Sequence, residues 1–238
     1  MKPEHLCPTL RQRLLQRVRA SHAQERQFLT VRREPVRGGD PPASGVRLRT
    51  LAHTTMATSS LVELHGGAVL DTDAAHTMLE AVVLEGSAFA GDFPLACGDA
   101  LLAPHDAAHA LRAGPGGTRL YLRRSRPATA PAELACFSTL DARGWDDFCP
   151  GVRIRALWEG GERRSVLVHM HPGARVNAHA HALEEECMML AGEAFIGDTL
   201  LRSGEYQLAP QGSRHGEITT DVGALFFVHG SLDPAAYA

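Results

Sequence analysis

The sequence predicts an all-β protein that contains two tandem copies of one domain behind a short N-terminal helix. Frequent turns are the first sign, because the 238 residues include 23 Gly and 14 Pro and only 5% aromatic residues. Short strand-like runs are the second: "RSVLVHM" alternates apolar and polar groups, and "ALFFVHG" has the pattern of a buried strand. A repeat at a fixed spacing is the third. Short strands divided by Gly and Pro favour a sandwich or a barrel over a parallel α/β sheet.

The front of the chain is the exception to the strand pattern. In "LRQRLLQRVRASHAQ" the residues Leu10, Leu14, Leu15 and Val18 stand at helical spacing, which predicts one amphipathic helix over residues 9–25. The following "FLTVRRE" has the character of a strand. The helix has an apolar stripe that needs a packing partner, which we expect to be a neighbouring barrel.

The repeat is visible without any gap. "SGVRLRTL" begins at residue 44 and "PGVRIRAL" at residue 150, an offset of 150 − 44 = 106 residues. At that offset "GSAFAGDFPLACGDALLAPHDAAH" falls on "GEAFIGDTLLRSGEYQLAPQGSRH", and 25 of the 65 pairs from Gly45/Gly151 to His109/His215 are identical. Shared composition alone does not produce such an alignment, so the chain contains a duplicated domain.

The repeat sets the predicted domain boundaries. Residues 1–37 form an N-terminal helix and strand arm, residues 38–123 the first domain, and residues 144–238 the second. Between them, residues 124–143 form a linker that begins within "RRSRPATAPAEL" (123–134), a segment rich in Pro, Ala and Arg.

Composition excludes several classes of protein. Hydrophobic content is 44% and the net charge is −3, which is typical of a soluble globular protein. No apolar run approaches the roughly 18 residues of a membrane helix and no signal peptide is evident, so we expect no membrane partner. Five cysteines without a CxxC motif indicate a reducing, cytoplasmic location. A nucleic-acid partner is not expected either, because the basic N-terminal segment has only Phe28 as an aromatic residue.

The segment "PGARVNAHAHALEEECMMLAG" holds the strongest chemical signal in the chain. His179 and His181 are two residues apart, so on a strand both imidazoles point to the same face and can reach one metal ion at about 2.0–2.1 Å. Glu185 can return to that face after a bend, and His215 follows a turn at Pro210 and Gly212. We therefore predict a metal site made of His179, His181, Glu185 and His215.

The spacing of these residues resembles the two motifs of the cupin superfamily. The first motif, Gly-x5-His-x-His-x3,4-Glu-x6-Gly, is met by Gly173, His179, His181, Glu185 and Gly192. The second motif, Gly-x5-Pro-x-Gly-x2-His, is met by Gly204, Pro210, Gly212 and His215, and departs from the family only at Thr219, where its final Asn would stand. This resemblance implies a pair of jelly-roll β-barrels and one divalent metal ion held by three His and one Glu. Cupins commonly dimerise, so the resemblance also implies a homodimer.

The residues around Glu185 divide by strand parity. Cys187 and Met189 share the parity of Glu185, so we expect them to line the cavity, with Met188 and Leu190 on the other side. Cys187 is interpreted as a small wall residue rather than a redox-active thiol. The flanking Glu184 and Glu186 are interpreted as solvated charges.

The first copy keeps the frame of the motif but not its ligands. At the 106-residue offset the four ligand positions become Asp73, Ala75, Leu79 and His109. His76 and Glu80 have the spacing of His181 and Glu185 displaced by one residue, but such a slip turns side chains to the opposite face unless a bulge intervenes. We therefore expect no metal in the first copy, which serves as a packing partner.

Residues 172–215 also resemble the ChrR-like cupin group through the run "PGARV…HxH…EE…G…PxGSxH". This resemblance implies a regulatory or stress-response protein that senses a small molecule or a reactive species. The anti-sigma members bind the sigma factor through a separate zinc domain with a His-x3-Cys-x2-Cys motif, which "HLCPTL" does not match. Sigma-factor binding is therefore not expected here.

The identity of the metal decides between two functions. Tetrahedral Zn²⁺ with four protein ligands gives a closed structural or sensory site, whereas Fe²⁺ accepts six ligands and keeps two positions open. Mn²⁺ and Ni²⁺ suit the same side chains. The alternative to a sensor is a non-haem Fe(II) dioxygenase that cleaves a diketone or an aryl ketone, and a pure scaffold is the third possibility. No phosphate loop, GxSxG motif or carboxylate pair supplies a further catalytic residue.

Overall fold

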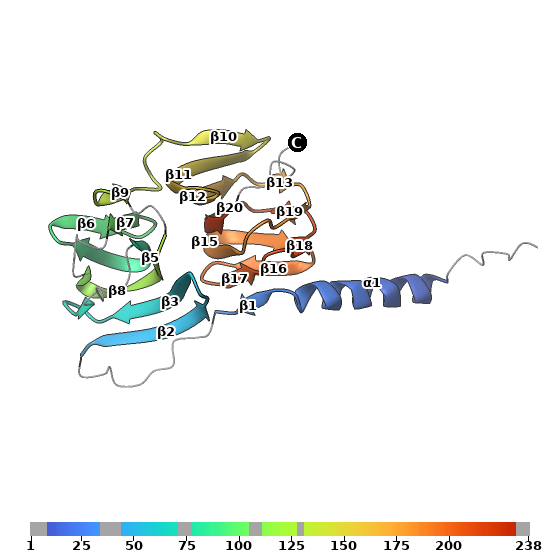
Figure 1. Ribbon diagram of the computed structural model, residues 1–238, viewed down its shortest axis with the longest axis horizontal. Helices are drawn as coiled ribbons and strands as arrows, with labels where there is room; N and C mark the ends of the chain where they lie inside the picture. The colour runs from blue at the N-terminus through green and yellow to red at the C-terminus, as the bar shows by residue number, and fades with distance from the viewer. Residues whose placement is uncertain (1–8, 34–43, 71–77, 105–110, 128–130, 232–238) are drawn as a thin grey trace, which may run out of the picture.

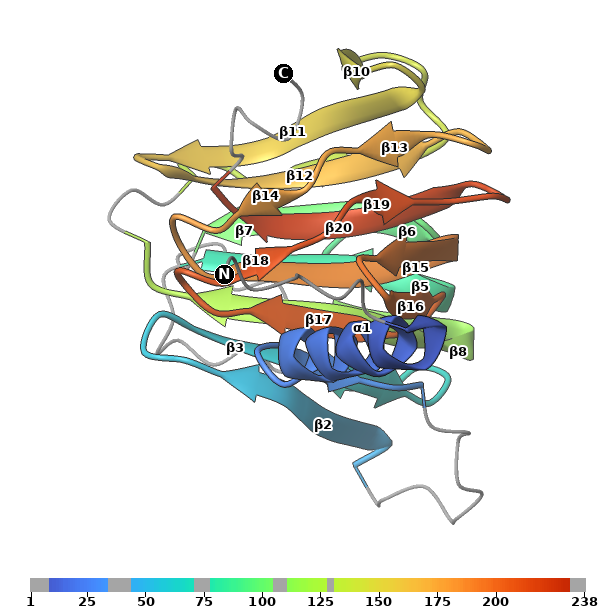
Figure 2. The ribbon, with the colours of Figure 1, turned by 90° about the vertical axis from the view of Figure 1, so that its right-hand side faces the viewer.

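The computed structural model describes residues 9–33, 44–70, 78–104, 111–127 and 131–231. Within these ranges the chain forms two β-barrels that lie side by side, with one helix beside the second barrel (Figure 1). The view from the side shows the helix on the face of the second barrel that points away from the first (Figure 2). The predicted all-β fold with two tandem barrels and a short N-terminal helix is confirmed. Among the described residues no helix is long and apolar enough to cross a membrane.

The first barrel contains an antiparallel sheet in the order β2-β3-β8-β5-β7-β9, with β4 beside β8 and β6 beside β5. Its strands are β2 (Val46–His53), β3 (Ala57–Leu64), β4 (Val69–Leu70), β5 (Met78–Ala90), β6 (Phe93–Ala96), β7 (Ala100–Pro104), β8 (Leu111–Ser125) and β9 (Ala135–Phe137). Its core is built from Val, Leu and Ala side chains on inward-facing positions, among them Leu79 at the repeat counterpart of Glu185.

The second barrel contains a sheet in the order β1-β17-β15-β20-β12-β11-β10, and the pairs β13–β19, β15–β16 and β14–β18 complete it. Its strands are β1 (Leu29–Val31), β10 (Asp146–Cys149), β11 (Val152–Gly160), β12 (Arg163–Met170), β13 (Arg175–Val176), β14 (His179–Ala180), β15 (Glu185–Ile196), β16 (Thr199–Arg202), β17 (Tyr206–Ala209), β18 (Arg214–His215), β19 (Ile218–Thr219) and β20 (Ala224–Gly230).

Each barrel receives one edge strand from the segment that precedes the other copy. The strand β1 precedes the first copy but pairs with β17 of the second barrel, with Val31 opposite Tyr206. The strand β9 precedes the second copy but pairs with β7 of the first barrel, with Phe137 opposite Ala100. Both pairs of positions are related by the 106-residue offset (137 − 31 and 206 − 100). The duplicated pattern therefore extends to a reciprocal exchange of strands.

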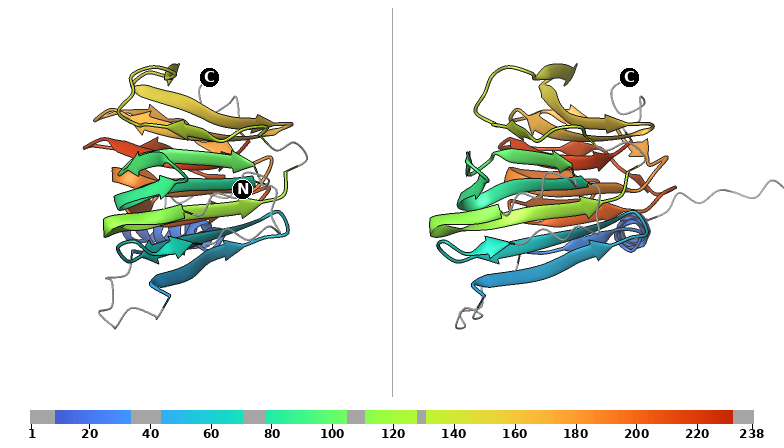
Figure 3. Two further views of the ribbon diagram at one scale, coloured as in Figure 1. Left: turned by 90° about the vertical axis from the view of Figure 1, so that its left-hand side faces the viewer. Right: turned by 60° about the vertical axis from the view of Figure 1, so that its left-hand side comes forward.

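The two barrels meet through their sheets over a shared apolar cluster. Leu61, Val82 and Tyr121 of the first barrel pack with Met188 and Phe227 of the second, and each is at most 5% exposed. Figure 3 shows the two sheets stacked in both views. Fully burying one such side chain contributes about 1.5–3 kcal/mol, so this contact holds the two barrels together as one unit.

A buried polar network lies inside that interface. Arg123 of the first barrel donates hydrogen bonds to Glu80 of its own barrel and to Glu186 of the second, both at 2.8 Å. Ser59 donates to Glu186, and Ser165 of the second barrel donates to Glu80, so each serine reaches across the interface. Both pairs are repeat counterparts (165 − 59 and 186 − 80 are each 106). The two copies therefore contribute equivalent residues to this network.

Glu186 corrects one interpretation of the sequence. It was expected to be a solvated charge, but it is 1% exposed and also accepts hydrogen bonds from Tyr121 and Tyr206. Burial acts to raise its pKa, but the Arg123 charge and the Ser59 hydrogen bond hold that pKa below its ordinary value. The first barrel covers the outward face of β15, and a carboxylate buried there needs a cation beside it. Glu184 is half-buried and accepts a hydrogen bond from Thr54 at 3.2 Å.

The predicted helix is present as α1 (Leu10–Glu25). It begins with a capping box: Gln12 accepts a hydrogen bond from the Thr9 backbone N–H at 2.7 Å, and the Thr9 hydroxyl accepts one from the Gln12 backbone N–H at 3.3 Å. Ser21 donates a hydrogen bond to Asp198, which attaches the helix to the β15–β16 turn. The four apolar residues of the stripe are all exposed, between 46% and 65%.

Candidate metal centre

Four side chains from β14 and the residue after it, β15 and β18 converge at one end of the second barrel. β14 and β18 pair with His179 directly opposite His215, His181 follows β14, and Glu185 is the first residue of β15. One potential ligand atom from each of the four residues lies within 4.8 Å of all the others. Ligands on opposite sides of an ion, each about 2.1 Å from it, lie about 4.2 Å apart, so the cluster is close to the size of a coordination shell. The structure thus brings together all four residues predicted from the sequence.

Backbone carbonyls fix the orientation of two of the imidazoles. The Nδ1 atom of His179 lies 2.9 Å from the carbonyl oxygen of Asn177, and Nδ1 of His215 lies 2.8 Å from that of Gly216. A carbonyl oxygen can only accept, so each Nδ1 carries the proton and donates it. The Nε2 lone pair of each ring is therefore available to a metal, which is the tautomer that such second contacts impose on metal-binding histidines.

The third imidazole, that of His181, indicates whether a metal ion fits this cluster. His181 is 2% exposed, and among the residues that the structure describes its Nε2 atom has no hydrogen-bond partner. Its Nδ1 atom lies 3.7 Å from the Glu185 carboxylate. A buried nitrogen without a partner costs about 1–3 kcal/mol, and a metal ion at the centre of the cluster would remove that cost. The donor set of three imidazoles and one carboxylate fits a divalent ion.

The electrostatics of the cluster keep its donors in the state that a cation requires. Burial lowers the pKa of His215 to about 4, against the opposing effect of its hydrogen bond to Gly216, so this imidazole is neutral at pH 7. Burial acts to raise the pKa of Glu185, but the contact with His181 and the neighbouring His179 and His215 hold it below its ordinary value. Neutral imidazoles and an ionised carboxylate bind metal ions without first losing protons.

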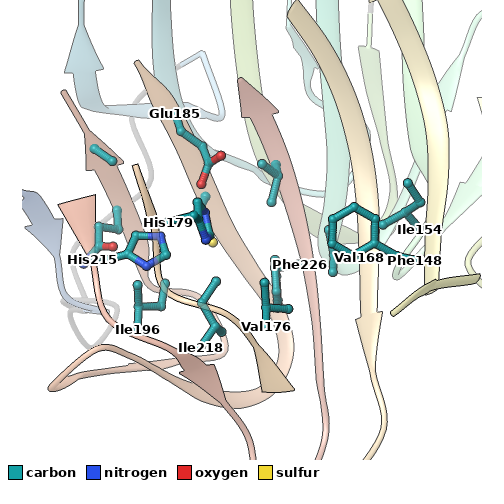
Figure 4. Close-up of a pocket in the computed structure, with 14 residues that line it drawn as sticks. Phe148, Ile154, Val168, Val176, His179, Glu185, Ile196, His215, Ile218 and Phe226 are labelled. Carbon is teal, nitrogen blue, oxygen red and sulfur yellow. The ribbon is translucent and has the colours of Figure 1, made fainter. Parts of the chain in front are cut away.

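An apolar pocket opens directly on this cluster. The space that it encloses amounts to about 680 Å³, open solvent at its mouth included. Its polar lining residues are His179, Glu185, Gln207 and His215. The rest of the lining is apolar and comes from strands throughout the barrel: Phe148, Ile154, Val168, Val176, Cys187, Ile196, Ala209, Ile218, Phe226 and Val228. Figure 4 shows the two histidines and Glu185 at one end, and Phe148, Ile154 and Val168 at the other.

The parity prediction for β15 is confirmed for Cys187, Met188 and Leu190, but Met189, which was expected to line the cavity, is not among the described residues that line the pocket. Cys187 lines the pocket, whereas Met188 faces the other barrel with Leu190 beside it. Met189 belongs to the core of the second barrel and is fully buried. Burial raises the pKa of the Cys187 thiol well above its ordinary value. The thiol is therefore protonated and a weak nucleophile, as expected of a wall residue.

The approach of the N-terminal arm to the site was not predicted from the sequence. The ring of Phe28 lies 6.2 Å from that of His215, and Thr30 accepts a hydrogen bond from the pocket residue Gln207 at 3.2 Å. Both arm residues arrive because β1 pairs with β17. Phe148 was not predicted either, since it lies on β10, ahead of the point at which the aligned repeat begins at Gly151. Strand pairing between segments so far apart leaves no local pattern in the sequence.

The first copy is tested only in part. Asp73, Ala75, His76 and His109 lie outside the described residues. At the counterpart of Glu185, Leu79 is buried in the apolar core of the first barrel. Glu80 does not face that core but pairs with Arg123 in the interface, at an Nη1–Oε2 distance of 2.8 Å. The displaced His76 and Glu80 pair therefore does not supply a carboxylate to the inside of the first barrel.

Two tandem jelly-roll barrels, one of which brings three His and one Glu together, define a bicupin with a candidate metal centre in its second barrel. Residues 135–233 match the family model of the ChrR Cupin-like domain, a range that begins at β9 and includes the whole cluster. This match supports a cupin assignment for the second barrel, and the fold of both barrels is that of the cupins. A comparison with curated protein sequences found no match.

Solved structures show the same fold at low sequence identity. A protein from Nostoc punctiforme, provisionally named a dioxygenase, is 19% identical with a TM-score of 0.62, over 81% of this chain and 75% of that one. A Cupin 2 conserved barrel domain protein from Leptotrichia buccalis is 11% identical with a TM-score of 0.59, over 79% and 89%. The oxalate decarboxylase of Bacillus subtilis is 13% identical with a TM-score of 0.52, over 79% and 73%. These likenesses establish the fold of the chain.

Proposed function

We propose that the second barrel holds one divalent metal ion on His179, His181, Glu185 and His215 and presents it to a small molecule in the adjoining pocket. The single observation that supports this proposal is that the pocket ends on three of the four ligand side chains. A closed structural site would be surrounded by protein on every side. A pocket that ends on the cluster instead favours an ion with open coordination positions, for which Fe²⁺ is the first choice and Mn²⁺ or Ni²⁺ are compatible.

The residues of the chain have distinct tasks in this function. The carbonyls of Asn177 and Gly216 orient His179 and His215, and the paired strands β14 and β18 set the spacing between the two rings. The apolar walls exclude water and bring a ligand against the cluster. A metal ion bound here supplies Lewis acidity and, if it is redox-active, a binding place for O₂.

Elemental analysis of protein purified without added metal tests the metal site. We expect close to one equivalent of a divalent metal per chain, and none in a variant that carries both His179→Ala and His181→Ala. His171→Ala is the matched control, because His171 is an exposed histidine near the cluster that is not part of it. Full metal content in the double variant would contradict the ligand assignment.

We further propose that the protein acts as a sensor of the ChrR-like type, in which a small molecule or a reactive species changes the metal centre. The match of residues 135–233 to the ChrR Cupin-like domain supports this role. The buried network between the barrels supports it as well, because Glu186 directly follows the candidate ligand Glu185 and is bound to the first barrel. A change at the centre would reach the whole molecule through β15. Exposure of the metal-loaded protein to hydrogen peroxide or singlet oxygen should release metal or change its fluorescence; an unaltered protein would count against a sensor.

A second candidate function is a non-haem Fe(II) dioxygenase. The observation in its favour is the apolar lining of a pocket that ends on a three-His, one-Glu cluster, since such a site gives an organic substrate and O₂ a shared, water-poor place at the metal. Oxygen consumption by iron-loaded protein over a panel of diketones and aryl ketones tests it. Turnover that disappears in the His179→Ala, His181→Ala variant supports the dioxygenase, and no uptake with any member of the panel contradicts it.

A further inference from the structure

The lining of the pocket contains no side chain that could balance a charge at its far end. Among the described residues that line it, none is Lys or Arg, and the polar groups are those of Gln207 and of three cluster residues, His179, Glu185 and His215. The amide of Gln207 already donates to Thr30. Moving an unpaired ionised group into such surroundings costs several kcal/mol, so a charge on the body of a ligand would be strongly disfavoured there.

The end of the pocket at the cluster, by contrast, favours a negatively charged group. The cluster contains one carboxylate and three imidazoles, so a divalent cation bound by these four ligands keeps one net positive charge. One anionic oxygen-donor head on the ligand completes that balance. A second anionic group would have to lie among Val168, Ile154 and Phe148, without a cation.

Phe148 forms the end of the pocket that lies opposite the cluster (Figure 4). It lies on β10, the edge strand of the sheet, and the register of β10 against β11 changes between Asp147 and Cys149. Phe148 is therefore the extra residue of a β-bulge, because Asp147 pairs with Arg153 while Cys149 pairs with Val152, the next residue of β11. A bulge redirects the side chain that it carries, and the ring of Phe148 lies at the end of the pocket opposite the cluster (Figure 4).

We infer that the natural ligand is a small, apolar molecule with one singly charged oxygen-donor head, and that Phe148 sets the length of the apolar body that the pocket accepts. The inference deepens the proposed metal-dependent function and rests on it. The head binds at the cluster of His179, Glu185 and His215, and the body lies along the apolar wall. A dicarboxylate whose second charge would lie among the apolar walls is excluded.

Alkyl hydroxamates provide the test, since they combine a metal-binding head with an apolar tail of chosen length. The full chain is loaded with Co²⁺, head binding is followed by the visible absorption of cobalt, and affinity by calorimetry. We expect each added methylene to raise affinity by roughly threefold to fourfold, the effect of burying one methylene group, until the tail reaches Phe148 and the gain stops. A flat series, with the same affinity for every tail, would overturn the inference.

A pair of probes of equal length isolates the charge preference. Heptanohydroxamate ends in a methyl group, and the monohydroxamate of adipic acid ends in a carboxylate at about the same distance from the head. We expect the methyl-ended probe to bind at least tenfold more tightly. Equal affinities would show that the pocket tolerates a second charge and would overturn the assigned ligand class.

Variants then test the role of Phe148. Phe148→Ala should move the plateau to longer tails, while Phe93→Ala, which removes an exposed phenylalanine from β6 of the other barrel, should leave the series unchanged. Ile154→Lys should invert the preference between the two equal-length probes by supplying the missing cation. If that lysine variant does not fold, the Phe148→Ala series remains decisive, and an unmoved plateau there refutes the role of Phe148.

The same experiment separates this inference from the function on which it depends. A protein that binds no Co²⁺, or whose cobalt absorption does not respond to any hydroxamate, refutes the open metal centre and the ligand class together. A cobalt response that is the same for charged and apolar tails leaves the metal centre standing and refutes the ligand class alone.

Discussion

Arg123 in the first barrel donates from its Nε atom to Oε1 of Glu186 in the second barrel, at 2.8 Å. Both side chains are at most 2% exposed, and Glu186 is the neighbour of the candidate ligand Glu185 on β15. Because side chains alternate along a strand, two consecutive glutamates face opposite ways: Glu185 lies at the cluster and Glu186 at the other barrel. One strand therefore connects the candidate metal centre to a barrel in which the counterpart of Glu185 is a leucine.

Replacing Arg123 should strongly destabilise the protein. Arg123→Met leaves Glu80 and Glu186 buried with their main cationic partner removed, and breaking a buried ion pair from one side typically costs about 3–5 kcal/mol. Chemical denaturation followed by circular dichroism measures the change in the free energy of unfolding. Arg143→Met is the control, since Arg143 is exposed and its replacement should leave the free energy of unfolding almost unchanged. Equal effects of the two substitutions would show that the network contributes little.

Stability should fall in acid because of Glu80. Burial acts to raise its pKa, but Arg123, His229 and Ser165 lower that pKa from 4.5 to about 2. A carboxyl whose pKa is lower in the folded state binds fewer protons there, so it stabilises the fold above pH 4.5 and loses that effect as the pH falls from 4.5 towards 2. Unfolding free energies measured across this window should decrease more steeply for the native chain than for Glu80→Gln. Parallel curves would contradict the assignment.

Metal should stabilise the folded chain through the cluster. A ligand that binds only the folded state adds about 2.7 kcal/mol at one hundred times its Kd, so the thermal midpoint should rise with added Co²⁺ or Fe²⁺. In His181→Ala, which removes the buried imidazole whose Nε2 has no hydrogen-bond partner in the described structure, this rise should be lost. His171→Ala should keep it. A rise of the same size in both variants would place the metal elsewhere.

Gly192 is expected to tolerate no side chain. Its φ is +71°, and a Cβ atom there would lie 2.0 Å from the carbonyl oxygen of Gly223. Gly161 has a similar φ of +64° but open space around its Cβ position, which makes it a matched control. Gly161→Ala should cost about 1–2 kcal/mol from the left-handed backbone alone, and Gly192→Ala clearly more, because the contact forces the strands apart. Urea denaturation of both variants measures the difference in unfolding free energy. Equal losses in the two variants would mean that the backbone around Gly192 shifts to make room for the added Cβ atom.

The parts of the site that the sequence predicted are those set by local spacing. His179 and His181 share a face because of strand alternation, and Gly192 and Gly212 stand where the backbone has positive φ. Glu186 was misinterpreted because parity shows that it faces away from Glu185 but not what covers that face. The sequence did contain a sign of this contact: at the 106-residue offset Glu80 aligns with Glu186, and Ser59 aligns with Ser165. Polar residues that are the same in both copies indicate a contact that both copies make. The approach of Phe28 and Thr30 to the centre depends on tertiary strand pairing, which no local pattern reveals.

The reciprocal placement of β1 and β9 has a consequence for the history of the chain. Neither half holds its complete sheet within its own sequence, because each provides the outermost strand of the other. A single-copy ancestor with this arrangement would be a dimer of identical chains that traded their first strands. Joining two such genes end to end would make the partnership permanent. One subunit could then lose its ligands and still be retained, because the other cannot be completed without it.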